Sequence, residues 1–280
     1  MPWADHARIP EAPAVSTSVD PSPRADHLSD ASLSSRPFLT AAWRDLAILN
    51  FEIAPHVLEP LVPTGTELDT WRGTTYVSVV GFRFLDTRVL GTRIPGHVDF
   101  EEVNLRFYVR HRENGEWRRG VVFIRELVPR RAIAWTARWW YNEPYRALPM
   151  RHSIERTSTG DACAARYEWR RAGTWETLAL RAAGELAPLP PGSEAEFITE
   201  HYWGYTRQRD GSSIEYRVEH PRWRVAPAAD VHLRCDVEAL YGRTFADALT
   251  QPPKSAFVAD GSAVTVFRPR RLPLAITPLA

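Results

Sequence analysis

The chain has 280 residues, of which 44% are hydrophobic and 25% charged, with a formal net charge of +1 at pH 7. This length suits one large domain or two small ones, and the charge balance gives no global field that would attract nucleic acid or an anionic membrane. No apolar run reaches the roughly 18 residues of a membrane helix, and no signal peptide is visible. We therefore expect a cytoplasmic protein that binds neither nucleic acid nor membrane.

The first 35 residues differ in composition from the rest of the chain. They are rich in Pro, Ser and Ala, and their apolar residues are isolated. Such a segment buries too little surface to offset its ordering entropy, so we expect residues 1–35 to be disordered. No second low-complexity linker and no internal repeat follows, which predicts a single domain over residues 36–280.

Most of this domain is predicted to be strand, because short β-branched and aromatic runs alternate with turn residues. A helical turn bounded by prolines is expected at 54–63. A turn at 113–115 predicts a hairpin between the strands on its two sides. The expected strands are 45–53, 74–84, 97–111, 117–127, 151–157, 162–170, 177–186, 212–223, and two strands on either side of Asp260 and Gly261 within 255–269.

Two longer helices are expected. One begins at Pro129, a favoured first helical position, and ends near Trp140. The other covers 192–206, where Ser193 and Glu196 form a capping box and Phe197, His201 or Tyr202, and Tyr205 share one stripe. About ten strands with two or three helices indicate an α+β protein built on a large, mainly antiparallel sheet or barrel.

The segment Phe100–Val109 shows the clearest alternation in the chain. Apart from Glu101, its odd-numbered positions are apolar, whereas Glu102, Asn104, Arg106 and Tyr108 carry hydrogen-bonding groups on the other face. This polar row is either a solvated outer face or the polar lining of a mostly apolar cavity. The sequence leaves both interpretations open.

Motifs that would name a reaction are absent from the sequence. It contains no HExxH, GxSxG, Walker or GxGxxG pattern, and Cys163 and Cys235 match no metal or redox spacing. His97, His201 and His220 are weaker candidates, since loop, packing and strand-end roles explain each of them as well. We predict neither a metal site nor a cofactor.

The order of these features resembles the DUF2071 family, which is similar to acetoacetate decarboxylase. The resemblance is carried by "WRDLAILNFEIAPHVLEPLVPTGTELDTWRGTTYVSVVGFRF", "FEEVNLRFYVR", "EHPRW" and "FVADGSAVTVFRP", and it extends from about Trp43 to Arg271. It implies an acetoacetate-decarboxylase-like fold, a cone-shaped and mainly antiparallel β-barrel with a few peripheral helices and a hydrophobic interior cavity.

The resemblance also implies site residues. In acetoacetate decarboxylase a Schiff-base lysine acts beside a second lysine, an arginine and a glutamate. Here the arginine falls on Arg44, the glutamate on Glu102, and the lysine pair on Arg130 and Arg131. A guanidinium stays protonated and cannot form an imine, and the one lysine, Lys254, lies in a Pro-flanked loop segment.

The leading hypothesis is a protein that binds a small, partly apolar molecule, with an anionic group as one option, and without Schiff-base chemistry. Arg44, Asn104, Arg106, Arg130 and Arg131 are the predicted ligand-binding residues. One alternative is a non-imine lyase, hydratase or isomerase that acts on a keto or carboxylic acid with Glu102 as acid or base. Another is a structural or homo-oligomer-forming protein whose own side chains fill the cavity.

Overall fold

The computed structural model describes residues 37–129 and 144–272. By compactness the chain divides into Met1–Ser35 and Arg36–Ala280, and every described residue belongs to the second unit. The expected disordered segment and the helix expected after Pro129 lie outside the described residues. None of the helices within the described ranges has the length and apolarity that crossing a membrane requires.

The described strands form one mainly antiparallel sheet, which confirms the predicted class, although there are fifteen strands rather than about ten. Only two pairings, β5 with β11 and β5 with β6, are parallel. The strands are β1 Pro37–Glu52, β2 Glu67–Leu68, β3 Tyr76–Val89, β4 Phe100–Glu113, β5 Glu116–Val128, β6 Tyr145–Ala147, β7 Met150–Arg156, β8 Ala162–Arg171, β9 Thr174–Ala182, β10 Ala187–Pro188, β11 Trp203–Arg207, β12 Ser213–Glu219, β13 Arg224–Arg234, β14 Ser255–Phe267 and β15 Arg270–Arg271. The helical segments are α1 Pro55–Leu58, η2 Glu59–Leu61, α3 Glu194–Thr199, α4 Val237–Tyr241 and α5 Arg243–Leu249.

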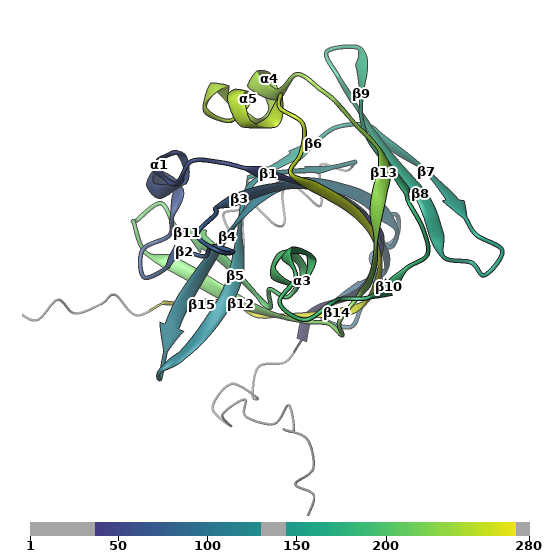
Figure 1. The fold of residues 1–280 in the computed structure, drawn as a ribbon. Coiled ribbons are helices and arrows are strands. Elements are labelled where there is room, and N and C mark those ends of the chain that lie inside the picture. Colours follow the sequence, from purple (N-terminus) through teal and green to yellow (C-terminus); the bar gives the residue numbers. More distant parts are fainter. Residues whose placement is uncertain (1–36, 130–143, 273–280) are drawn as a thin grey trace, which may run out of the picture. The chain divides into compact units, whose positions relative to one another are not determined.

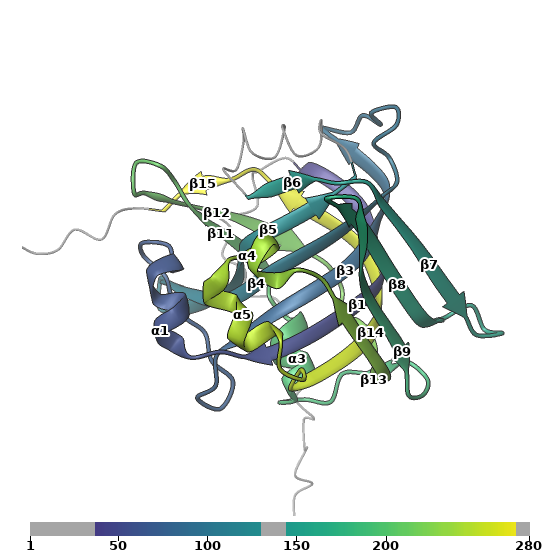
Figure 2. The same cartoon turned by 90° about the horizontal axis from the view of Figure 1, so that it is seen from above.

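Seven strands close into a ring (Figure 1). Along the sheet their order is β12, β11, β5, β4, β3, β1 and β14, and β12 also pairs with β14 through Val218 and Val266. Beyond β14 the sheet continues through β13 into β9, β8 and β7, which cover one side of the ring as an outer layer (Figure 2). The chain therefore buries both faces of several ring strands.

The hairpin of β4 and β5 confirms the turn prediction. Asn114 and Gly115 both have positive φ, 53° and 88°, as a two-residue hairpin loop requires. On β4, the odd-numbered Val103, Leu105, Phe107 and Val109 are fully buried in a core shared with the outer layer and with α4 and α5. The even-numbered positions from Phe100 to Tyr108 face the inside of the ring.

Helix α3 lies inside the ring in the view of Figure 1 and packs Phe197 against Tyr76 and Tyr108. Its cap is the predicted one, because Ser193 Oγ accepts a hydrogen bond from the Glu196 backbone N–H. The helix is shorter than predicted, however, and ends at Thr199. Tyr205, which we expected on its stripe, instead lies on β11, where its buried ring packs in the outer core.

A second correction concerns β14, which passes through Asp260 and Gly261 as one strand rather than two. Gly261 has a φ of 71°, and a Cβ there would lie 2.7 Å from Leu46 Cδ1. A glycine inside a strand marks a close backbone approach, and here β14 approaches β1 beside Trp43. The Asp-Gly pair therefore serves a close strand contact and not a hairpin turn.

Candidate functional site

A pocket of about 260 Å³ lies inside the ring. Its lining comes from all seven ring strands, from β6, from the β3–β4 loop, from the end of α3, and from the segments that follow α3 and β12. Aromatic rings form much of its wall: Trp43 meets Phe82, Phe84 and Trp223 edge-on, and Phe84 stacks on Phe100 with ring centroids 4.6 Å apart. The described side chains therefore leave an apolar chamber and do not fill it.

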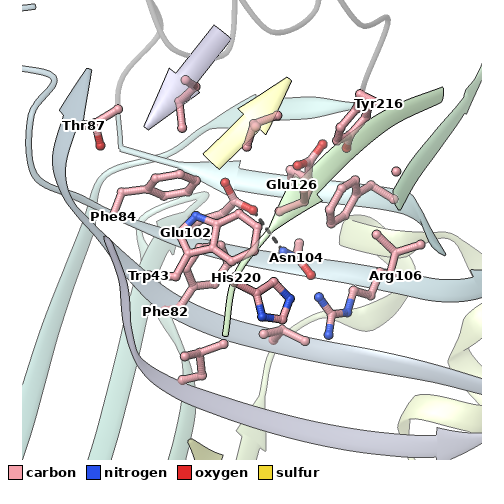
Figure 3. Close-up of a pocket in the computed structure, with 18 of the residues that line it drawn as sticks. Trp43, Phe82, Phe84, Thr87, Glu102, Asn104, Arg106, Glu126, Tyr216 and His220 are labelled. Atoms are coloured by element: carbon pink, nitrogen blue, oxygen red, sulfur yellow. Dashed lines mark hydrogen bonds between the residues drawn. The ribbon is translucent and has the colours of Figure 1, made fainter. Parts of the chain in front are cut away.

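The even-numbered row of β4 supplies polar groups to this chamber (Figure 3). Glu102, Asn104 and Arg106 all line the pocket, and Glu102 and Asn104 are only 2% and 1% exposed. Asn104 Nδ2 donates a hydrogen bond of 2.9 Å to Glu102 Oε1. Of the two interpretations of this strand, the geometry favours the cavity lining over the solvated face.

Arg106 lies at the end of the row, half-buried. Its Nη2 makes one long hydrogen bond, 3.4 Å, to the Ile198 carbonyl, and its guanidinium carbon lies 5.7 Å from the centre of the Tyr108 ring. No carboxylate of the described residues lies within ion-pair distance of it, and no described group accepts a hydrogen bond from its buried Nε. The pocket wall thus carries a cation whose hydrogen-bonding capacity is largely unused within the described structure.

Glu126 on β5 is a pocket residue that the sequence analysis missed. It is 1% exposed, lies opposite Asn104 in the strand register and lines the same chamber. The hairpin register places residue 125, not 126, opposite Asn104 when it is counted from the turn. A β-bulge between Leu105 and Arg106 shifts the register by one residue, which turns Glu126 inward and leaves Arg125 to bond the Leu240 carbonyl outside the ring.

The three candidate histidines, His97, His201 and His220, all line the pocket. Burial lowers the pKa of His201 to about 4, although Asp69 lies 3.5 Å from its Nε2 and opposes this shift. Burial also lowers the pKa of His220. The His220 ring stacks on Trp223 and its Nδ1 lies 3.0 Å from the Pro221 carbonyl, which fixes the ring in place. Both imidazoles therefore favour their neutral form.

Arg44 lies outside this lining. Its Nη1 donates to the Gly261 carbonyl at 2.8 Å, and the next residue, Asp45, has a φ of 59° at a register shift between β1 and β3. This irregularity lets Trp43 and Leu46 both face the pocket and turns Arg44 away from it. Arg130 and Arg131 lie outside the described residues.

Lys254 is also remote from the pocket. Its side chain is 55% exposed and its Nζ pairs with Glu52 at 3.0 Å. Because this is the one lysine of the chain, the pocket contains no amine side chain for an imine. Within the described ranges, no three His, Cys, Asp or Glu side chains gather closely enough to hold a metal ion.

Solved structures with the same fold include enzymes. An acetoacetate decarboxylase from Legionella pneumophila matches with a TM-score of 0.57 and 14% identity, over 87% of this chain and 90% of that one. The enduracididine biosynthesis enzyme MppR in complex with pyruvate matches with a TM-score of 0.58 and 11% identity, over 88% and 94%. At these identities the likeness shows an acetoacetate-decarboxylase-like fold and nothing finer.

Sequence comparison identifies the family. The uncharacterized protein YqjF of Bacillus subtilis (strain 168) is 28% identical over 184 residues, which is 64% of this chain and 72% of that protein. The profile of DUF2071, described as an uncharacterized conserved protein, matches residues 40–263. This match runs from within β1 to within β14 and includes every described residue that lines the pocket except Phe38, Leu39 and Val266. The chain is a member of the DUF2071 family.

Proposed function

We propose that the pocket binds a small, partly apolar molecule whose anionic group lies at Arg106, and that it does so without Schiff-base chemistry. The observation that carries this proposal is Arg106, a half-buried guanidinium in an aromatic chamber with no described carboxylate beside it. A half-buried cation that no carboxylate neutralises is costly, and a bound carboxylate would supply charge-assisted hydrogen bonds. Arg130 and Arg131 remain predicted anion ligands.

The proposal is tested by thermal unfolding in the presence of benzoate and isobutyrate, with benzamide and isobutyramide as neutral counterparts. A ligand that binds the folded state raises the melting temperature by mass action. We expect the carboxylates to raise it and the amides to have little effect. Equal shifts with acids and amides, or no shift with any of them, would contradict an anion site.

Two variants make the test specific to the residue. Arg106→Met should abolish the shift caused by carboxylates. Arg110→Met is the matched control, because Arg110 lies further along β4 with the same parity but is outside the pocket, where it pairs with Glu67. A carboxylate shift that survives in Arg106→Met, or one that is lost equally in Arg110→Met, would contradict the assignment of the anion to Arg106.

The exclusion of imine chemistry has its own test. Borohydride added with pyruvate should trap no adduct, because Lys254 is exposed and paired with Glu52. A covalent adduct on Lys254, detected by mass spectrometry, would overturn this part of the proposal.

A second candidate function is proton transfer on a keto acid, with Glu102 as acid or base. It is favoured by one observation: two glutamates, Glu102 and Glu126, are buried in the same apolar chamber. Carboxyl groups in such surroundings commonly serve as proton-transfer groups. The reaction class would be abstraction of a proton next to a carbonyl group.

Exchange of the C3 protons of 2-oxobutanoate in heavy water, followed by NMR, tests this candidate. The protein should accelerate exchange, and Glu102→Gln should remove the acceleration. Glu101→Gln is the matched control, since the neighbouring Glu101 faces the other side of β4 and bonds His152 Nδ1 at 2.6 Å. Exchange at the uncatalysed rate with the unaltered protein would exclude this function for that substrate.

A further inference from the structure

The orientation of the Asn104 amide is fixed by its neighbour Glu102. The amide nitrogen Nδ2 donates to Glu102 Oε1, and only the NH₂ end of an amide can donate to a carboxylate. The carbonyl oxygen Oδ1 must therefore point the other way. Figure 3 shows it on the side of the amide that faces Arg106.

This oxygen is an acceptor whose capacity is unused within the described structure. Asn104 is 1% exposed and lines the pocket, and no described group donates a hydrogen bond to its Oδ1. A buried polar atom without a partner costs free energy, and natural proteins keep few of them. A ligand that donates a hydrogen bond here would remove that cost.

The acceptor and the cation are held at a fixed spacing. Asn104 and Arg106 are two residues apart on one face of β4, so their backbones are about 6.6 Å apart along the strand. A single ligand of modest length can therefore reach both groups. Such a ligand needs a hydrogen-bond donor at one end and an anionic group at the other.

The size and walls of the chamber restrict the rest of the ligand. An engineered cavity of about 150 Å³ holds benzene in another protein, so a pocket of about 260 Å³ accommodates about ten non-hydrogen atoms by the same proportion. Trp43, Phe82 and Trp223 offer aromatic surface to an apolar body. A neutral hydroxyl is the donor that such surroundings desolvate at least cost, because an ammonium group would bring a charge with it.

We infer that the natural ligand of this pocket is a small hydroxy acid with an apolar, ring-sized body, whose carboxylate lies at Arg106 and whose hydroxyl donates to Asn104 Oδ1. This inference rests on the proposed anion site and adds the second contact. It assigns Asn104 as a ligand-binding residue and Glu102 as the positioning residue that orients it. No covalent step is required.

The probes are para-hydroxybenzoate and para-toluate, which have the same number of non-hydrogen atoms and differ in hydroxyl against methyl. Affinity for each is measured by isothermal titration calorimetry at neutral pH, with para-cresol as the probe that lacks the carboxylate. One additional neutral hydrogen bond predicts that para-hydroxybenzoate binds on the order of tenfold more tightly than para-toluate.

Two variants test the assignment to Asn104. Asn104→Leu keeps the branched shape and the number of non-hydrogen atoms of the side chain but removes the acceptor, so the preference for the hydroxyl should disappear. The exchange variant Glu102→Gln with Asn104→Asp reverses the internal hydrogen bond and still presents an oxygen at residue 104, so it should retain the preference. The exchange variant keeps the hydrogen bond between residues 102 and 104. It therefore provides the test of Asn104 if Asn104→Leu does not fold.

The outcomes separate the inference from the proposed function. Equal affinity for the two benzoates would overturn the hydroxy-acid inference and leave the anion site standing. A preference that survives in Asn104→Leu would overturn the role of Asn104. No binding of either benzoate, or para-cresol binding as tightly as para-hydroxybenzoate, would overturn the anion site and the inference together.

Discussion

Gly204 on β11 lies opposite Tyr216 on β12, and both residues line the pocket. A Cβ added to Gly204 would overlap the Tyr216 ring, with Cε2 at 2.5 Å and Cζ and Oη closer still. Carbon atoms in contact normally lie about 3.5–4.0 Å apart, so the ring would have to move by about 1 Å or more. Overpacking of this kind costs about 1–3 kcal/mol. We therefore expect Gly204→Ala to lower the free energy of unfolding by about that amount and to weaken ligand binding, because the displaced ring borders the pocket.

The assay is urea unfolding followed by tryptophan fluorescence, in a double-mutant cycle with Tyr216→Ala. Without the ring, Gly204→Ala should be neutral or slightly stabilising, because alanine loses less conformational entropy than glycine in a strand. Gly184→Ala is the control, since a Cβ at Gly184 meets nothing within 4 Å and a surface change of this kind stays within about 0.5 kcal/mol. An equal cost of Gly204→Ala with and without the Tyr216 ring would refute the reasoning.

Three further predictions concern stability. Leu105→Ala removes a fully buried side chain from the outer core and should lower the free energy of unfolding, measured in urea, by about 2–5 kcal/mol. The ligand affinity of the pocket should stay unchanged, because Leu105 faces away from it. A loss of less than about 1 kcal/mol, as for a surface change, would contradict the burial of Leu105. Burial lowers the pKa of His201 from 6.5 to about 4, so between these values the unfolded chain binds a proton that the folded chain does not. The stability that the neutral His201 contributes is therefore complete above pH 6.5 and is lost as the pH falls towards 4. His201→Gln should flatten the curve of unfolding free energy against pH in that window. An unchanged slope would contradict this role of His201. Ser193→Ala removes the side-chain cap of α3 and should cost about 1 kcal/mol, whereas Ser193→Thr, which keeps the hydroxyl, should cost clearly less in the same measurement.

The polar row of the site could be predicted from the sequence because β4 is regular. Its period of two places Glu102, Asn104 and Arg106 on one face without knowledge of the rest of the chain. Which face points inward could not be predicted, because both faces of β4 are covered in the folded protein. The answer depends on the outer layer of β7, β8 and β9, which pairs with the ring through β13. The outer layer forms through contacts between residues far apart in the sequence, so the sequence of β4 alone does not show which of its faces that layer covers.

The residues that sequence reasoning misplaced lie next to irregularities of the strands. A bulge on β5 turns Glu126 into the pocket, and the positive φ of Asp45 accompanies the turn of Arg44 away from it. One extra residue in a strand reverses the face of everything beyond it. The local sequence signal is weak at both positions: Asp45 is only one of several residue types that tolerate a positive φ, and Ile124, the residue of β5 that the register with β4 skips, carries no such signal.

The predicted end of helix α3 and the predicted break within β14 were wrong for a different reason. The segment around Tyr205 has an acceptable helical stripe, yet its ring is needed in the outer core beside Gly120, where a Cβ would lie 2.5 Å from Tyr205 Cε2. Tertiary packing therefore overrides local periodicity after Thr199. The Asp-Gly pair of β14 gave a hairpin signal that the continuous pairing of β14 with β1 overrides in the same way.

One face of β4 packs in the outer core and the other lines the chamber. Substitutions on one face can therefore occur without affecting the other. The odd-numbered residues belong to the outer core and set the stability of the domain, whereas the even-numbered residues meet whatever occupies the chamber. Under the proposed function, a relative could change its ligand by substitutions at positions 102, 104 and 106 of β4 together with position 126 of β5. The same separation makes these four positions a compact target for a combinatorial library built on an unaltered scaffold.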